Sequence, residues 1–191
     1  MKKSLYRFLF YRLMGWKIVG TIDPKIKQCV MVILPHTSWH DFYLGIFTRG
    51  ITGLDMHFVA KTELFRFPFA GYFRWMGGAA LDRSGGLNKV DAIAAIFKER
   101  KVFRMAISPE GTRKKVTQLK TGFYYIALKA QVPIIPVAFD FEHKEVKLGA
   151  PFYPTGSLEE DAVFIFSHFK GVKGKVPEYS FEYDPKNSPF I

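Results

Sequence analysis

The sequence predicts a single α/β domain with a largely parallel central sheet flanked by helices. Short apolar runs typical of buried strands alternate with stretches of helical periodicity along the chain. No segment reaches the roughly 18 uninterrupted apolar residues of a membrane-spanning helix. A length of 191 residues suits one domain with a proper core. We therefore expect this domain over residues 21–191, preceded by a helical segment over residues 1–20.

The N-terminal segment, residues 2–17, has the spacing of a basic amphipathic helix. At about 100° per residue, one broad face collects Leu5, Phe8, Leu9, Leu13 and Trp16. Lys3 and Arg7 lie opposite, while Arg12 interrupts the apolar face. Such a helix suits a membrane interface, and it could equally dock on the core of its own domain. The sequence leaves both alternatives open.

The other elements follow from apolar periodicity and from breaker residues. We expect strands over 29–34, 57–60, 102–107, 134–141 and 146–148. We expect helices over 41–51, 63–76, 89–100, 122–130 and 158–170. Thr62 and Asn88 are suited to cap two of these helices, and Pro68 interrupts the aromatic one. The tail from Gly171 contains Gly, Lys and Pro, and we expect it to end loosely.

Composition limits the kinds of partner. The formal charge of +11 favours a polyanion, whether nucleic acid, anionic lipid headgroups or a phosphorylated substrate. Aromatic residues make up 17% of the chain, enough for some rings to face a ligand or lipid. Cys29 is the only cysteine, which excludes an internal disulfide and fits a reducing, cytoplasmic setting. The basic N-terminus lacks the apolar stretch and cleavage site of a signal peptide.

The stretch from Pro35 to Asp41 follows a predicted strand and leads into a predicted helix. His36 and Asp41 are five residues apart, which would place them about 140° apart on a continuous helix. They can pair only if His36 lies in the turn and Asp41 in the first helical turn. The carboxylate would then fix the imidazole tautomer and leave the other nitrogen as a base. His36 and His40 could also form a metal pair, but no third ligand lies nearby, and we expect no metal.

Two further stretches offer groups for an anion. After the strand over 102–107, Gly111 permits an unusual turn, Thr112 adds a hydroxyl, and Arg113 offers a guanidinium fork with Lys120 behind it. The glycine-rich stretch over 77–86, which contains Arg83, is a plausible phosphate cradle, although it is not a Walker loop. Taken alone, each stretch also fits a solvated surface turn.

In this order, the stretches resemble the glycerolipid acyltransferase family, typified by bacterial 1-acylglycerol-3-phosphate acyltransferases. His36 to Asp41 is similar to the HxxxxD motif of the family, and Glu110 to Arg113 reproduces EGTR. Gly77 to Arg83 is similar to the GxxFIxR block, and Val132 to Val137 to the fourth, proline-containing block. The resemblance spans about residues 30–137. Pro35 stands where the family often has Asn, and Ala80-Leu81 replaces Phe-Ile, so the acceptor need not be a lysophosphatidate.

The resemblance implies an O-acyltransferase. His36 would be the general base and Asp41 its orienting partner. The residues that would bind the phosphate-bearing acceptor are Arg83, Glu110, Gly111, Thr112, Arg113 and Lys120. The acceptor hydroxyl would attack an acyl-CoA or acyl-carrier-protein thioester without any cofactor. We expect a lysophospholipid such as 1-acylglycerol-3-phosphate as acceptor, with an amino-acid-containing lyso-lipid as the alternative.

The predicted setting is the cytoplasmic face of a membrane, with peripheral or monotopic attachment. The N-terminal helix and the aromatic segment over 64–75 are the candidates for membrane contact. A basic nucleic-acid-binding module would explain the charge but leave the HxxxxD and EGTR motifs without a purpose, so we expect no nucleic acid. A non-catalytic membrane-binding domain and an acyl-thioester hydrolase are the remaining alternatives.

Overall fold

A computed structural model describes residues 2–61, 66, 68, 70–81, 89–184 and 190–191. Within these residues one sheet of seven strands has the order β1-β7-β6-β2-β5-β3-β4. The strands are β1 (Lys17–Val19), β2 (Gln28–Leu34), β3 (Met56–Lys61), β4 (Gly78–Leu81), β5 (Phe103–Ile107), β6 (Ile134–Asp140) and β7 (Glu145–Leu148). Every pairing is parallel except that of β6 with β7. The predicted α/β class is confirmed.

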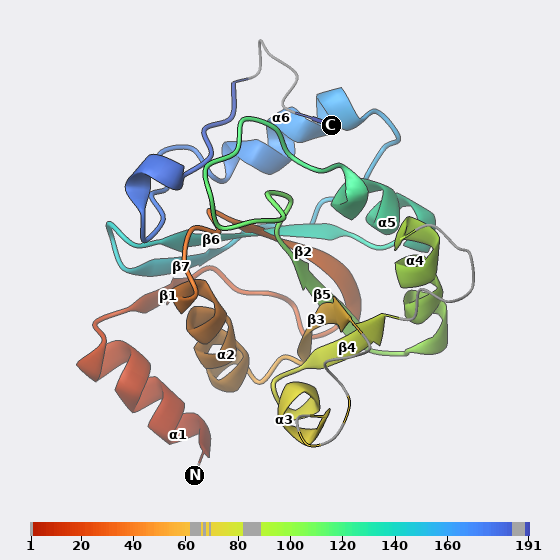
Figure 1. The fold of residues 1–191 in the computed structure, drawn as a ribbon. Helices are drawn as coiled ribbons and strands as arrows, with labels where there is room; N and C mark the ends of the chain where they lie inside the picture. Colours follow the sequence, from red (N-terminus) through yellow and green to blue (C-terminus); the bar gives the residue numbers. More distant parts are fainter. Residues whose placement is uncertain (1, 62–65, 67, 69, 82–88, 185–189) are drawn as a thin grey trace.

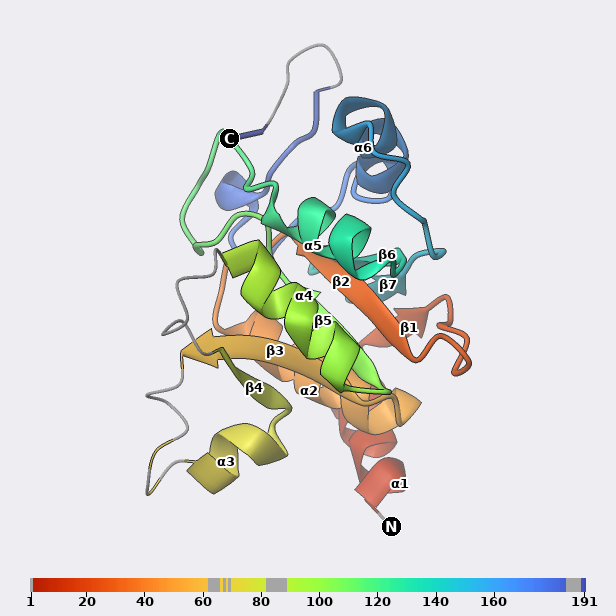
Figure 2. The same ribbon diagram turned by 90° about the vertical axis from the view of Figure 1, so that its right-hand side faces the viewer.

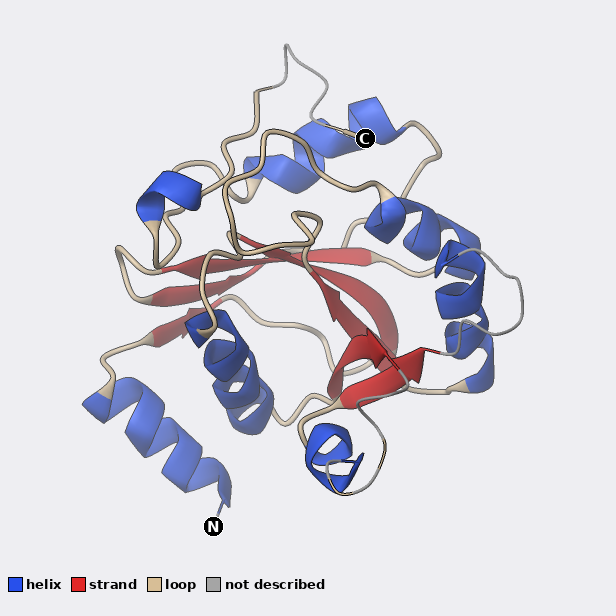
Figure 3. Ribbon diagram, in the orientation of Figure 1, coloured by secondary structure: helices blue, strands red, loops and turns tan. Residues whose placement is uncertain are grey.

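Helices cover both faces of the sheet (Figures 1 and 3). The α-helices are α1 (Lys2–Arg7), α2 (His40–Thr52), α3 (Ala70–Trp75), α4 (Lys89–Glu99), α5 (Gly122–Ala130) and α6 (Leu158–Ser167). α1 and α2 lie on one face, while α4, α5 and α6 lie on the other (Figures 1 and 2). This is the layered arrangement expected when a parallel sheet is buried on both sides.

The central strand β2 explains why the two faces have separate cores. Val30, Val32 and Leu34 are buried with apolar residues of α4, α5 and α6. Cys29 and Met31 point the other way and pack with residues of α1 and α2. Side chains alternate across a strand, so an apolar run without polar interruptions is what a doubly covered strand requires.

The N-terminal segment differs from the predicted helix over 2–17. α1 continues as a π-helical stretch (Phe8–Leu13), in which the Met14 N–H donates to the Leu9 carbonyl at 2.9 Å. The helix ends before Gly15, whose φ is +70°, and β1 then pairs in parallel with β7. The predicted helix over 2–17, and the helical segment expected over 1–20, are therefore wrong from Gly15 onward, because strand pairing at the sheet edge prevails over helical periodicity there.

The helix packs on the domain and also leaves apolar side chains in solvent. Phe10 is fully buried and contacts Phe47 of α2, with ring centroids 5.8 Å apart. Three members of the predicted apolar face, Leu5, Phe8 and Leu13, are more than half exposed. The segment therefore docks on its own domain through Phe10, and membrane contact by the exposed side chains stays a prediction.

The stretch predicted as a phosphate-cradling loop is partly strand, because Gly78–Leu81 forms β4 and pairs in parallel with β3. Pairing satisfies the backbone groups that β3 would otherwise leave unpaired. Arg83 and the capping residues Thr62 and Asn88 lie outside the described residues, as does most of the predicted aromatic helix before α3.

The C-terminal tail is not loose over its described part. Val172 is buried in the core, Pro177–Tyr179 forms a 3₁₀ turn, and Phe190 bridges to Leu119. Packing of these apolar residues outweighs the loop-forming composition that the sequence shows. The described residues include no helix with both the length and the apolar character needed to cross a membrane.

Candidate active site

The His36 turn, residues 35–39, connects β2 to α2 and lies at the carboxyl end of the central strand. The Leu34–Pro35 peptide bond is cis. His36 lies in this turn and Asp41 in the first turn of α2, and His36 Nδ1 is 3.0 Å from Asp41 Oδ2. The geometry that the five-residue spacing required is therefore present.

Asp41 is fixed in place by the start of the helix. Its side chain is buried, and Oδ2 also accepts from the Ser38 N–H at 3.0 Å. The positive end of the α2 dipole favours a carboxylate at this position. With its Nδ1–H donated to Asp41, the His36 ring presents Nε2 as a proton acceptor. The His36 side chain is 25% exposed, so a substrate can reach that nitrogen.

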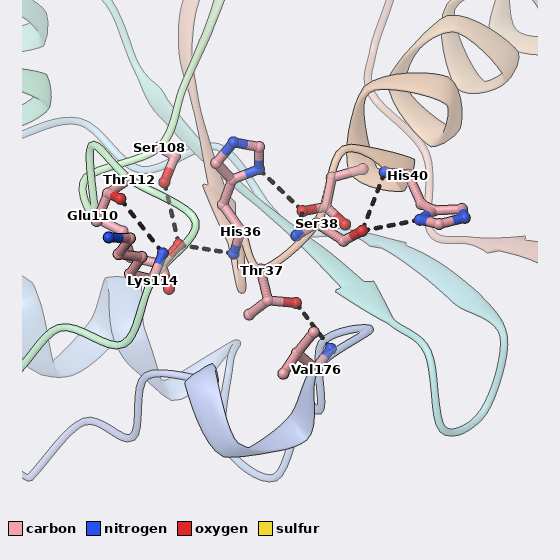
Figure 4. A network of polar contacts seen from close by, with 10 residues as sticks. His36, Thr37, Ser38, His40, Ser108, Glu110, Thr112, Lys114 and Val176 are labelled. Carbon is pink, nitrogen blue, oxygen red and sulfur yellow. Dashed lines mark hydrogen bonds and ion pairs between the residues drawn. The ribbon is translucent and has the colours of Figure 1, made fainter.

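Glu110 supports the His36 turn from the neighbouring strand. β2 and β5 are adjacent and parallel, so the turns that follow them meet at one edge of the sheet. The His36 N–H donates to Glu110 Oε2 at 2.7 Å, and the Ser108 hydroxyl donates to the same oxygen at 3.2 Å (Figure 4). Glu110 is only 3% exposed. Its carboxylate therefore contacts the turn that carries His36 and does not face solvent.

Burial also changes the titration of Glu110. Desolvation raises the pKa of its carboxyl from 4.5 to about 7, against the opposing effect of the hydrogen bonds from His36 and Ser108. The folded protein thus keeps this proton to a higher pH than the unfolded chain does. The contribution of Glu110 to the free energy of unfolding is fully present below about pH 4.5. It falls by up to roughly 3 kcal/mol as the pH rises to 7 and above.

Glu110→Gln removes this titration while keeping an oxygen that can accept from His36. We expect the free energy of unfolding of wild type, relative to that of Glu110→Gln, to fall between about pH 5 and pH 8. It falls because the folded protein must lose the Glu110 proton there, whereas the unfolded chain has already lost it. Urea unfolding of both proteins across this range provides the measurement, and other titrating groups cancel in the difference. Two parallel curves would show that Glu110 does not titrate there.

Two cavities meet at His36. One, of about 410 Å³, extends between α2 and the sheet. Its lining is mostly apolar and includes Met31, Ile33, Phe42, Gly45, Ile46, Met56, Phe58, Met76, Val137 and Phe139. The other, of about 560 Å³, is an open pocket lined by His36, Ser108, Gly111, Thr112, Arg113 and Lys114. His36, Ser108 and Arg113 line both, so the imidazole lies at the junction of an apolar space and a cationic one.

The predicted anion-binding residues on the turn after β5 lie at or near the open pocket. Gly111 adopts a φ of +65°, and a Cβ there would lie 2.7 Å from Lys120 Nζ, so Lys120 packs along this turn. Thr112 is exposed, and its Oγ1 accepts from the Lys114 N–H at 3.3 Å. Arg113 is exposed at the mouth of both cavities. These residues come together at one end of the sheet, and Arg83 lies outside the described residues.

The residues that line the apolar cavity were not predicted from the sequence. Phe42, Gly45 and Ile46 face it from α2, and His57 lines it from β3. The available signal was a glycine inside an apolar helix, because Gly45 lowers helix stability and its presence points to a need for space beside it. A Cβ built on Gly45 would meet nothing within 4 Å.

His36 and His40, the alternative metal pair, have different partners in this structure, since His36 contacts Asp41 and His40 does not. His40 Nδ1 lies 2.8 Å from Ser38 Oγ, and its ring stacks on Trp39 at 4.0 Å between centroids. In the part of the chain that the structure describes, the one cluster with metal-compatible spacing is at Asp140, Glu142 and His143, after β6. Asp140 is already paired there with Lys147 and His143.

Comparison with known proteins identifies the family of this chain. The family model described as Acyltransferase matches residues 19–140. A chloroplastic 1-acyl-sn-glycerol-3-phosphate acyltransferase, BAT2 of Brassica napus, is 32% identical over 139 residues, covering 70% of this chain and 38% of that protein.

Two bacterial relatives carry the name 1-acyl-sn-glycerol-3-phosphate acyltransferase. The Salmonella typhimurium protein is 35% identical over 96 residues, covering 47% of this chain and 39% of its own length. The Haemophilus influenzae protein is 31% identical over 144 residues, covering 72% and 60%. The chain thus spans between about two fifths and three fifths of these relatives. The family match includes the His36 turn, Asp41 and Glu110 to Arg113, and the chain belongs to the Acyltransferase family.

Proposed function

We propose that this protein is an O-acyltransferase that moves a fatty acyl group from an acyl-CoA or acyl-carrier-protein thioester to a lysophospholipid hydroxyl. The acceptor that fits best is 1-acylglycerol-3-phosphate, the substrate named in its relatives. The observation that carries the proposal is the position of the His36–Asp41 pair. It lies where an apolar cavity, suited to a fatty acyl chain, opens into a pocket with Arg113 and Lys114.

The proposed step needs one base. His36 Nε2 takes the proton of the acceptor hydroxyl as its oxygen attacks the thioester carbonyl carbon. The tetrahedral intermediate collapses with cleavage of the carbon–sulfur bond, and the leaving thiolate takes the proton back from His36. Asp41 keeps Nδ1 protonated and stabilises the imidazolium that forms between the two transfers. Atoms and charge balance without any cofactor.

The acceptor phosphate is proposed to bind in the open pocket. Arg113 offers a guanidinium that can bind two oxygens of a phosphate, and the Gly111 turn lets the backbone approach closely. Lys114 and Lys120 add positive charge near this turn. Glu110 would act indirectly, by holding the turn that carries His36.

Arg113→Ala tests this assignment and the choice of acceptor. With 1-acylglycerol-3-phosphate we expect the acceptor KM to rise roughly tenfold or more with a smaller change in kcat, because a charge-assisted contact is lost. The same assay with an amino-acid-containing lyso-lipid is the alternative arm. A higher kcat/KM for that acceptor, with no effect of Arg113→Ala on the KM of the phosphate acceptor, would reject the phosphate-binding role.

We further propose that the protein works at the cytoplasmic face of a membrane, held there peripherally. The exposed side chains Leu5, Phe8 and Leu13 lie on a helix that also carries Lys3, Arg7 and Arg12. Tyr72 and Trp75 of α3 are also more than half exposed. Apolar side chains beside basic ones suit the boundary of an anionic bilayer.

The double substitution Leu5→Ser/Leu13→Ser tests this surface. We expect the affinity for vesicles containing anionic lipid to fall roughly tenfold or more, since each leucine loses its burial in the interface. Leu128→Ser/Val163→Ser is the matched control, because these side chains are exposed on α5 and α6, on the opposite face of the sheet. Equal losses in the two double variants, measured by vesicle sedimentation, would assign no special role to the N-terminal helix.

A further inference from the structure

Thr37 is a polar residue buried at the centre of the His36 turn. It is 5% exposed, whereas the residue before it, His36, lines both cavities. Its Oγ1 accepts from the Val176 N–H at 3.1 Å. In Figure 4 Thr37 points away from Ser108 and Glu110, towards Val176. The turn is therefore held on two sides, by Glu110 at the His36 N–H and by Val176 at the Thr37 hydroxyl.

The contact with the C-terminal segment is close as well as polar. Gly174 is buried, and a Cβ built on it would lie 2.5 Å from Thr37 Oγ1 and 3.2 Å from Pro35 Cβ. A glycine is required here by proximity, because a larger residue would push the turn away. The backbone of Gly174 thus forms part of the wall against which the His36 turn packs.

We call residues 172–180 the C-terminal clamp, and it is itself firmly attached. The Phe141 N–H, directly after β6, donates to the Lys173 carbonyl at 2.8 Å. The Gly174 N–H donates to Ser180 Oγ at 2.9 Å, and Val172 is buried in the main core. β6 is the neighbour of β2, the strand that leads into His36. The clamp can therefore hold the turn relative to the sheet.

We infer that the C-terminal clamp positions the catalytic base, with Thr37 as the positioning residue through which it acts. This inference rests on the proposed function of His36. The clamp lies beyond residues 19–140, the part of the chain that the family model matches. A displacement of about 1 Å in a reacting group can cost roughly 10²-fold in rate. A hydrogen bond of ordinary strength can therefore matter far more for kcat than for folding.

Three variants separate an effect on the position of His36 from an effect on the stability of the fold alone. Thr37→Val keeps the shape of the side chain but leaves the Val176 N–H without its acceptor, whereas Thr37→Ser keeps the acceptor. For Thr37→Val we expect kcat to fall about tenfold or more, with KM values within about twofold of wild type. Thr37→Ser should recover most of kcat. Glu178→Ala, at an exposed position of the same clamp, is the control and should match wild type.

The melting temperature and an NMR measurement complete the test. We expect Thr37→Val to lower Tm by about 2–4 °C, as one lost hydrogen bond would. The His36 Nδ1–H resonance reports the bond to Asp41 without any turnover. A fourth variant, Gly174→Ala, would place a Cβ against Thr37 Oγ1. The resonance should shift in Thr37→Val and Gly174→Ala but stay in place in Thr37→Ser and Glu178→Ala.

The outcomes distinguish the two claims. Equal kcat losses in Thr37→Val and Thr37→Ser, or an unchanged His36 resonance in both Thr37→Val and Gly174→Ala, would overturn the positioning role. A wild-type protein that transfers no acyl group would overturn the proposed function instead. In that case the resonance alone decides whether the clamp positions His36.

Discussion

Replacing His36 with alanine is expected to lower kcat for acyl transfer by roughly 10²–10⁴-fold, the range typical of a lost general base. The fold should survive, because the side chain is partly exposed and packs at the edge of a cavity. Asp41→Asn should cause a loss of similar size. An amide can accept from the His36 Nδ1–H, but it cannot stabilise the imidazolium as a carboxylate does.

The double variant His36→Ala/Asp41→Asn makes this prediction specific. If Asp41 acts through His36, the two losses will not add, and the double variant will be about as slow as His36→Ala alone. The control is His40→Ala, which removes a neighbouring histidine whose ring packs on Trp39 and is not bound to Asp41. Initial rates at saturating donor and acceptor provide the measurement. Additive losses, or a wild-type rate in His36→Ala, would remove the dyad from the mechanism.

Gly45→Phe is expected to change which acyl chains are used. Gly45 lines the apolar cavity from α2, and an added Cβ there would point into space that is free within 4 Å. A phenyl ring in that space would displace roughly four methylenes of a long acyl chain. At ~0.8 kcal/mol per methylene, this corresponds to a loss of roughly 10²-fold in kcat/KM for a long-chain donor.

The matched controls for Gly45 use the same change in other places. Gly45→Ala should have little effect, because a single methyl group fits. Gly122→Phe introduces the same ring at another helical glycine with free space around it, one that does not line the cavity, and should keep the wild-type preference. A panel of acyl-CoA donors of increasing length provides the measurement. A uniform loss at all lengths in Gly45→Phe would place the acyl chain elsewhere.

Much of the fold could be predicted because its central strands carry strong local signals. β2, β5 and β6 are mostly apolar, with Arg104 in β5 and Asp140 at the end of β6 as the charged exceptions, and the helices between them have clear periodicity. β1 and β4 were missed because they are short edge strands of three and four residues, one beginning with a glycine. Such strands form because an adjacent strand has unpaired backbone N–H and C=O groups. The local sequence does not show which strand will be adjacent.

The site was predictable to the extent that its parts are close in sequence. The pairing of His36 with Asp41 followed from a spacing of five residues and a turn before a helix. The contact of Glu110 with the His36 backbone joins residues 74 apart, and it depends on β2 and β5 being neighbours. The contact of Thr37 with Val176 joins residues 139 apart. Such contacts depend on the order of the strands in the sheet, and that order cannot be predicted from any single stretch of the sequence.

The central claim is that a hydroxyl of a lysolipid, and not water, receives the acyl group at His36. Mass spectrometry of the products formed by purified protein from a long-chain acyl-CoA and 1-acylglycerol-3-phosphate tests it directly. We predict that the doubly acylated glycerol phosphate appears in proportion to the CoA released, and that neither forms with His36→Ala. Release of free fatty acid in place of the acylated lipid, or equal product with His36→Ala, would contradict the claim.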